Sequence, residues 1–148
     1  MEILIYSIEK TKDGFGVDEY VKMSKNYAKI SEHVFFNNKI AKAQSKSRAD
    51  SLKAYDEVYE SKIEGFCIAL DEGGDMLDSL EFARLLVNNS KISFFIGGPY
   101  GLSDGFKSKM NRVVSLSRLT FAHKIAKLVL YEQIFRGLTI NANHPYHK

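Results

Sequence analysis

The residues best able to do chemistry stand in a glycine-rich loop and in a histidine-containing tail. The loop, GGPYG at 97–101, directly follows the apolar run 92–96. Glycine lets a backbone come close to a ligand or to another chain segment. The phosphate-binding GK[ST] sequence is absent, and Pro99 lacks an amide donor, so the loop is a poor phosphate cradle. It suits a neutral or cationic ligand with apolar parts; a tight turn without a ligand is the alternative.

The tail, HPYHK at 144–148, combines two histidines, an aromatic ring and a lysine. Histidine exchanges protons near neutral pH, which makes His144 and His147 candidate acid–base residues. Two histidines are too few for a metal site, and we predict none. A surface tail without a role is the alternative interpretation.

Composition excludes several classes of protein. The only cysteine, Cys67, lies in the apolar run 66–70, which indicates a small buried hydrophobe and rules out an internal disulfide. No apolar run approaches the ~20 residues of a membrane helix, and the start of the chain does not resemble a signal peptide. We therefore expect a cytoplasmic protein with no membrane partner.

The net charge of +3 is unevenly distributed along the chain. Residues 105–148 contain eight lysines and arginines, whereas the only acid among them is Glu132. A basic C-terminal third favours a polyanionic partner such as RNA. A solvated surface with charges placed for solubility is the alternative.

The elements that would position these residues follow from hydrophobic periodicity. The runs typical of strands are 1–7, 33–36, 66–70, 92–96 and part of 113–121. The stretches with helical spacing are 17–31, 47–63, 80–89 (capped by Ser79) and 123–138. The polar segments 37–46 and 71–75 are predicted to be loops.

Alternating strands and helices predict one α/β domain over residues 1–148, with a mostly parallel sheet and helices on both faces. Ligands of such sheets bind at the carboxyl ends of the strands. The loops expected there are 71–75, 97–101 and the region around 115–121.

Four strings occur in an order and spacing that is specific to one family. They are IGGPYGL at 96–102, SLSRLTFAH at 115–123, LYEQIFRG at 130–137 and HPYHK at 144–148. On these motifs the whole chain resembles the RlmH family, the SPOUT-superfamily methyltransferases of N3 of a pseudouridine in 23S rRNA. The resemblance implies a C-terminal deep trefoil knot, S-adenosylmethionine as cofactor and a homodimer with sites at its interface.

The resemblance also implies roles for individual residues. The implied cofactor contacts are Leu70, Gly97, Gly98, Leu116, Ser117, Arg118, Leu119, Thr120 and Phe121. The implied catalytic and RNA-side residues are Arg136, His144, Tyr146, His147 and Lys148.

The chemistry of N3 methylation agrees with these residues. The ring nitrogen must lose a proton, so we hypothesise that His147 deprotonates or positions the base. Tyr146 would stack on the flipped nucleotide, while Arg136 and Lys148 would anchor phosphates. Without an appended RNA-binding module, specificity is expected to require the assembled ribosome.

Two other functions stay open from the sequence. One is a knotted, catalytically inactive dimer that binds rRNA or the ribosome. The other is an α/β protein that binds a nucleotide unrelated to RNA. Intact SLSRLT and HPYHK segments favour the enzyme.

Overall fold

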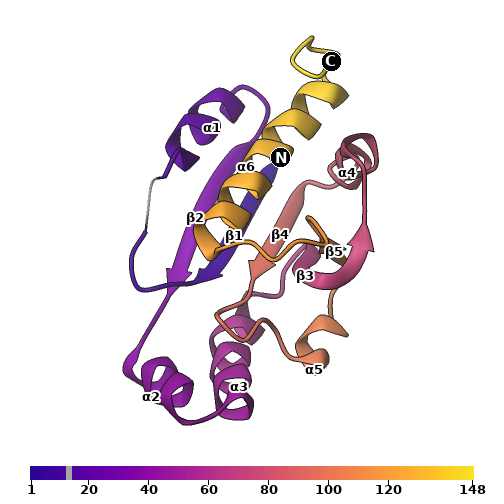
Figure 1. Ribbon diagram of the computed structural model, residues 1–148. Coiled ribbons are helices and arrows are strands. Elements are labelled where there is room, and N and C mark those ends of the chain that lie inside the picture. The colour runs from indigo at the N-terminus through magenta and orange to yellow at the C-terminus, as the bar shows by residue number, and fades with distance from the viewer. Residues whose placement is uncertain (13–14) are drawn as a thin grey trace.

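The computed structural model describes residues 1–12 and 15–148, which form a five-stranded sheet (Figure 1). Its strands are β1 (Glu2–Ile8), β2 (Lys29–Phe35), β3 (Phe66–Met76), β4 (Lys91–Ile96) and β5 (Arg112–Ser115). Their order is β2-β1-β4-β3-β5, and every neighbouring pair is parallel. The predicted α/β class and parallel sheet are therefore confirmed, while the trefoil knot stays a prediction.

Helices cover both faces of the sheet, as predicted. The core on one face includes α1 (Val17–Ser24), α4 (Ser79–Leu85) and α6 (His123–Asn141). The core on the other includes α2 (Asn38–Lys46), α3 (Arg48–Tyr59) and α5 (Asp104–Lys107), and the 3₁₀ turn η1 (Glu60–Lys62) follows α3. Successive residues of β1 enter opposite cores, as a parallel sheet buried on both faces requires.

The segment 37–46, predicted to be a loop, is the helix α2. The Asn37 side chain caps it by accepting a hydrogen bond from the Ile40 amide at 2.8 Å. Only Ile40 and Ala43 of this helix are buried, so its sequence is mostly polar. The wrong prediction arose because two buried side chains suffice to attach a short amphipathic helix to a larger core.

Two predicted boundaries near the N-terminus are also wrong. The helix predicted over 17–31 ends at Ser24, and strand β2 begins at Lys29 rather than at residue 33. Strand β2 forms one edge of the sheet and pairs only with β1, Ile30 lying opposite Ile3. An edge strand is only partly buried, so its apolar pattern is weak.

The predicted loop 71–75 lies within strand β3. The pairing of β3 with β5 shifts between Leu70 and Asp75, so the segment bulges before the strand resumes. Helix α4 is capped by Asp78 rather than Ser79, because Asp78 and Glu81 exchange side-chain-to-backbone hydrogen bonds in a capping box.

Helix α3 supports the glycine-rich loop from behind. The buried hydroxyl of Tyr59 donates to the Ile96 carbonyl at 2.6 Å, at the last residue of β4. Burial raises the pKa of Tyr59 well above its ordinary value, so this hydroxyl keeps its proton. Since Ile96 precedes the loop, Tyr59 determines where the loop begins.

The start of helix α6 is attached to the sheet by a buried ion cluster. The Lys127 side chain, 3% exposed, contacts Glu9 Oε1 at 3.0 Å and also pairs with Glu32 of β2. His123 Nε2 lies 2.8 Å from the other carboxylate oxygen of Glu9. Burial alone would raise the pKa of Glu9, but Lys127, His123 and Ser7 outweigh it and lower that pKa.

Replacing Tyr59 by Phe should lower the free energy of unfolding by about 1 to 3 kcal/mol, because the Ile96 carbonyl loses a buried donor. Urea unfolding measures this change. Tyr131→Phe is the matched control, since the Tyr131 hydroxyl is buried without a hydrogen-bond partner in the described residues. Equal destabilisation by both substitutions would contradict this role of Tyr59.

Replacing Glu9 by Gln should destabilise the protein near neutral pH and matter less in acid. Because folding lowers the pKa of Glu9, its carboxylate stabilises the folded protein at any pH above the pKa of the unfolded state. This contribution disappears as the pH falls through the pKa of the folded state. Unfolding free energies from pH 7 to 3 should therefore converge for the variant and the wild type. The exposed Glu72 forms no ion pair in the described residues, so Glu72→Gln should track the wild type throughout.

Candidate active site

A cavity of about 1000 Å³ opens at the carboxyl ends of the strands. Its walls come from the ends of β1, β3 and β4, the segment after β5 and the start of α6. The chain runs from β1 outward to β2 but places β4 on the other side of β1, so the strand order reverses beside the cavity. Parallel α/β sheets bind ligands at such a reversal, and the volume suits a cofactor-sized molecule.

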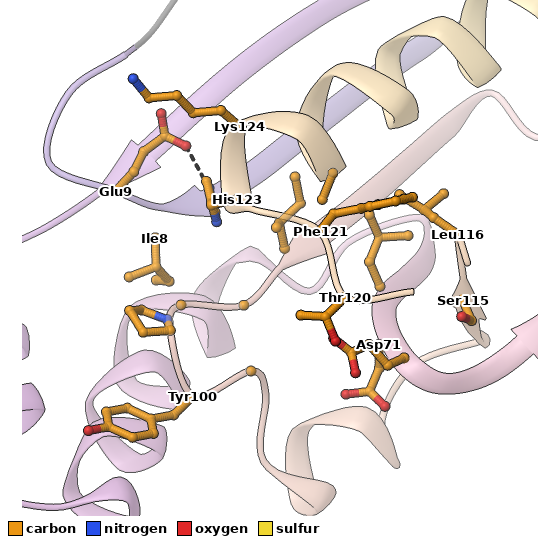
Figure 2. A pocket seen from close by; sticks show the side chains of 18 of the residues that line it. Ile8, Glu9, Asp71, Tyr100, Ser115, Leu116, Thr120, Phe121, His123 and Lys124 are labelled. Carbon is orange, nitrogen blue, oxygen red and sulfur yellow. Dashed lines mark hydrogen bonds and ion pairs between the residues drawn. The ribbon is translucent and has the colours of Figure 1, made fainter. Parts of the chain in front are cut away.

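The cavity gathers eight of the nine residues predicted to bind the cofactor. They are Leu70, Gly97, Gly98, Leu116, Ser117, Leu119, Thr120 and Phe121. The ninth, Arg118, is exposed and does not line the cavity. Figure 2 shows Leu116 and Phe121 together on one wall, with Thr120 beside Asp71. Their contact with a cofactor stays a prediction.

The glycine-rich loop is a tight turn that also forms a wall of the cavity. The Gly101 amide donates to the Gly98 carbonyl at 2.9 Å. A Cβ on Gly97 would lie 2.4 Å from the Gly101 backbone, and one on Gly98 would lie 2.5 Å from the Tyr55 hydroxyl. Close packing of the loop on itself and on α3 therefore requires glycine at both positions.

Several cavity residues were not predicted from the sequence. The segment 9–11 after β1 contributes Glu9, and Arg48, Lys107 and His123 also line the cavity, whereas Asp71 belongs to the loop 71–75 expected at this edge. The signal that points to them is the rule that parallel strand ends share one edge. It identifies β1 only once the strand order is known, because neighbours in a sheet need not be neighbours in sequence.

The cavity wall carries charges of both signs, with the acids Glu9, Asp71 and Glu72 and the cations Lys10, Arg48, Lys107 and Lys124. Figure 2 shows Glu9 paired with His123 near the start of α6, and Asp71 across the cavity. Asp71 Oδ1 lies 3.4 Å from Lys107 Nζ, so part of its charge is balanced. Backbone groups and apolar side chains make up much of the remaining wall.

The predicted catalytic residues form a separate cluster centred on Glu132. Glu132 Oε1 accepts hydrogen bonds from Arg136 Nε and Nη2 at 2.9 and 2.6 Å, and from the Tyr146 hydroxyl at 3.1 Å. Tyr146 packs edge-on against Phe135, and the Arg136 guanidinium lies 4.8 Å from the centre of the Tyr146 ring. The tail is therefore folded back onto helix α6 in a defined arrangement.

His147 joins this cluster through Arg136, whose Nη1 lies 3.2 Å from its Nδ1. A guanidinium can only donate, so Nδ1 accepts and the neutral ring carries its proton on Nε2. His144 and Lys148 are exposed. Arg136, Tyr146 and His147 are thus brought together, whereas His144 and Lys148 stay apart from them.

The cavity lies at the start of α6, whereas the tail cluster packs on the later turns that hold Glu132 and Arg136. From His123 to Arg136 the helix rises about 20 Å at the usual rise per residue. His123 at its start lines the cavity, and the tail begins only beyond Asn141. One chain therefore does not bring the predicted cofactor and catalytic residues into contact.

The one cysteine of the chain, Cys67, is buried in the core, as its apolar neighbours predicted. Burial raises the pKa of the Cys67 thiol, and its Sγ contacts the Glu64 carbonyl at 3.4 Å. In residues 1–12 and 15–148, no three His, Cys, Asp or Glu side chains are grouped to hold a metal ion. No helix in the same residues combines the length and apolar character needed to cross a bilayer.

Sequence comparison finds close relatives over the whole chain. The chain is 60% identical to "Ribosomal RNA large subunit methyltransferase H" of Campylobacter concisus and 61% identical to that of Campylobacter fetus, with 100% of each chain covered. The Aliarcobacter butzleri protein of the same name is 48% identical over the same share.

Structure comparison finds the same fold in more distant proteins. A probable methylase family protein from Haemophilus influenzae superposes with a TM-score of 0.56 at 12% identity, covering 95% of this chain and 66% of that one. A tRNA (m1G37) methyltransferase from Aquifex aeolicus superposes with a TM-score of 0.53 at 14% identity, covering 92% and 70%.

The family model described as "Predicted SPOUT methyltransferase" matches residues 1–147. With the parallel sheet and the full-length relatives, this match shows that the chain belongs to the SPOUT methyltransferase family.

Proposed function

We propose that this protein transfers a methyl group from S-adenosylmethionine to N3 of a pseudouridine in the 23S rRNA of bacterial ribosomes. The observation that carries the proposal is 60% identity over the full chain to a protein named ribosomal RNA large subunit methyltransferase H. The assembled ribosome in the cytoplasm is the proposed substrate, because 148 residues leave little surface for reading an RNA sequence unaided.

The cavity fits S-adenosylmethionine in size and chemistry. Leu70 and Leu116 are partly buried apolar residues that would hold the adenine, with Leu119 at the exposed rim. The glycine-rich loop would bring backbone groups to the adenine edge. Asp71, whose charge Lys107 balances only in part, is the carboxylate that would face an ammonium or sulfonium charge, since Glu9 is paired with Lys127 and His123. The bound cofactor supplies an electrophilic methyl group.

The tail cluster would complete the site of a second copy of the chain. Since about 20 Å of α6 separates His123 at the cavity from Arg136 in the tail cluster, a homodimer is the simplest arrangement that places His147 beside a cofactor. Arg136 is bound by Glu132 on two nitrogens, so we assign it to holding the tail in shape rather than to anchoring phosphate. Lys148, which is exposed, remains available for a phosphate.

We propose that His147 positions the substrate by donating a hydrogen bond to it. Its Nδ1 accepts from Arg136, so the Nε2–H group would donate to a carbonyl of the pseudouridine ring, while the N3 proton would be lost to solvent water as the methyl group is transferred. Holding N3 in line with the methyl group contributes to the rate through orientation. Tyr146 packs on Phe135 and Arg136, so its ring would support the tail in addition to contacting the base.

An inactive rRNA-binding dimer is the second candidate. The enzyme is favoured because the cavity lining and the tail cluster are both assembled. Incubating the protein with S-adenosylmethionine and ribosomes from cells lacking this activity decides between them. Mass spectrometry should locate one new methyl group on N3 of a 23S pseudouridine; binding without any transfer would favour the inactive dimer.

Replacing Gly97 by Val should weaken binding of S-adenosylhomocysteine at least tenfold, because a Cβ at this position would lie 2.4 Å from the Gly101 backbone and must displace the loop. Calorimetry measures the affinity, and circular dichroism confirms folding. Gly105→Ala is the matched control, since its Cβ would meet only the Ser103 hydroxyl at 3.9 Å. Unchanged affinity in Gly97→Val would exclude the loop as a cofactor wall.

Co-expressing Gly97→Val with the double variant Arg136→Ala/His147→Ala should restore activity that each lacks alone. Random pairing makes half of the dimers mixed, and each mixed dimer has one intact cavity facing one intact tail, so about a quarter of the wild-type rate is expected. Methyl incorporation into ribosomes measures the recovery. Two tagged subunits purified in tandem isolate the mixed dimer; no recovery there would place cavity and tail of each site in one chain.

A further inference from the structure

A second cavity, of about 250 Å³, lies as a groove between α2 and α3. Its floor includes two alanines, and its rim holds four lysines and two acids. The lining residues are Lys39, Lys42, Ala43, Lys46, Asp50, Lys53, Ala54 and Glu57. A small-residue floor beneath long cationic side chains leaves room for an extended chain of negative groups.

The acids neutralise only half of the lysines in the groove. Lys39 pairs with Glu57 at 2.5 Å, and Lys46 lies 3.9 Å from Asp50. Lys42 and Lys53 are exposed and form no ion pair with any described residue. Two unpaired ammonium groups facing one groove repel each other, and an anionic ligand would remove that cost.

The C-terminal third, which the sequence favoured as the polyanion surface, is largely neutralised by acids. Five of its eight cations are paired. The pairs are Lys107–Asp71, Lys109–Glu60, Arg112–Asp75, Lys127–Glu9 and Arg136–Glu132. Arg118 and Lys148 of this third stay exposed without an ion pair in the described residues, and Lys42, Arg48 and Lys53 form a second set of such cations on α2 and α3.

Arg48 connects the groove to the large cavity. It is exposed, lines that cavity and forms no ion pair within residues 1–12 and 15–148. It follows Lys46 by two residues, a span of no more than about 7 Å. Figure 1 shows α2 and α3 side by side at the end of the sheet to which the strand arrows point. Cations thus continue from the groove to the cavity mouth.

We infer that the α2–α3 groove binds the phosphodiester backbone of the rRNA beside the target base and that Arg48 leads this strand to the cavity. The inference rests on the proposed function and adds a contact surface outside the cavity and the tail. Phosphates recognised by lysines carry no sequence information but set the register of the RNA.

The double variant Lys42→Gln/Lys53→Gln tests the inference by cosedimentation with unmethylated ribosomes over a range of KCl concentrations. We expect the dissociation constant to rise about tenfold and the slope of log affinity against log salt to fall by about 1.5, because two phosphate contacts are lost. Binding of S-adenosylhomocysteine should stay unchanged. Lys22→Gln/Lys25→Gln, which removes two exposed lysines at the end of α1, is the matched control and should bind ribosomes as the wild type does.

Equal weakening by both double variants, or wild-type binding by Lys42→Gln/Lys53→Gln, would overturn the inference. Failure of the proposed function has a different signature. Wild-type protein that binds ribosomes but transfers no methyl group would end the proposed function, while the comparison of the two double variants would still decide the groove.

Discussion

The buried ammonium group of Lys127 is the contact on which the arrangement of the site depends. It lies between the carboxylates of Glu9 and Glu32 and so attaches helix α6 to the end of β1 and the middle of β2. A lysine this deeply buried requires such partners, because an unpaired charge in the interior is strongly destabilising. Because the start of α6 is held beside the cavity, the tail that follows the helix packs on its later turns, away from the cavity.

This separation explains how a small chain can divide one reaction between two places. The cavity offers apolar walls and close backbone, which suit the adenine of the proposed cofactor. The tail offers a histidine oriented by Arg136, which is itself bound to Glu132. In the proposed homodimer, a symmetric pair of chains would supply two complete sites, because each tail would serve the cavity of its partner.

Packing also decides which charges are available to a partner. In the C-terminal third, most cations contact acids from distant elements, as Lys107 contacts Asp71 and Lys109 contacts Glu60. On α2 and α3, Lys42 and Lys53 have no acidic partner in the described part of the chain. A charge count along the sequence weighs every lysine equally, whereas only unpaired ones attract a polyanion.

The sequence by itself determined the α/β class, the three central strands β1, β3 and β4, and helix α6, because their apolar runs are long or clearly periodic. Its motifs also pointed to eight of the residues that line the cavity. It did not reveal helix α2, whose burial rests on Ile40 and Ala43, or the part of the cavity formed after β1. The cavity wall after β1 depends on strand order and on the ion pair between Lys127 and Glu9. These two residues lie more than a hundred positions apart in the sequence, and only the tertiary structure brings them together.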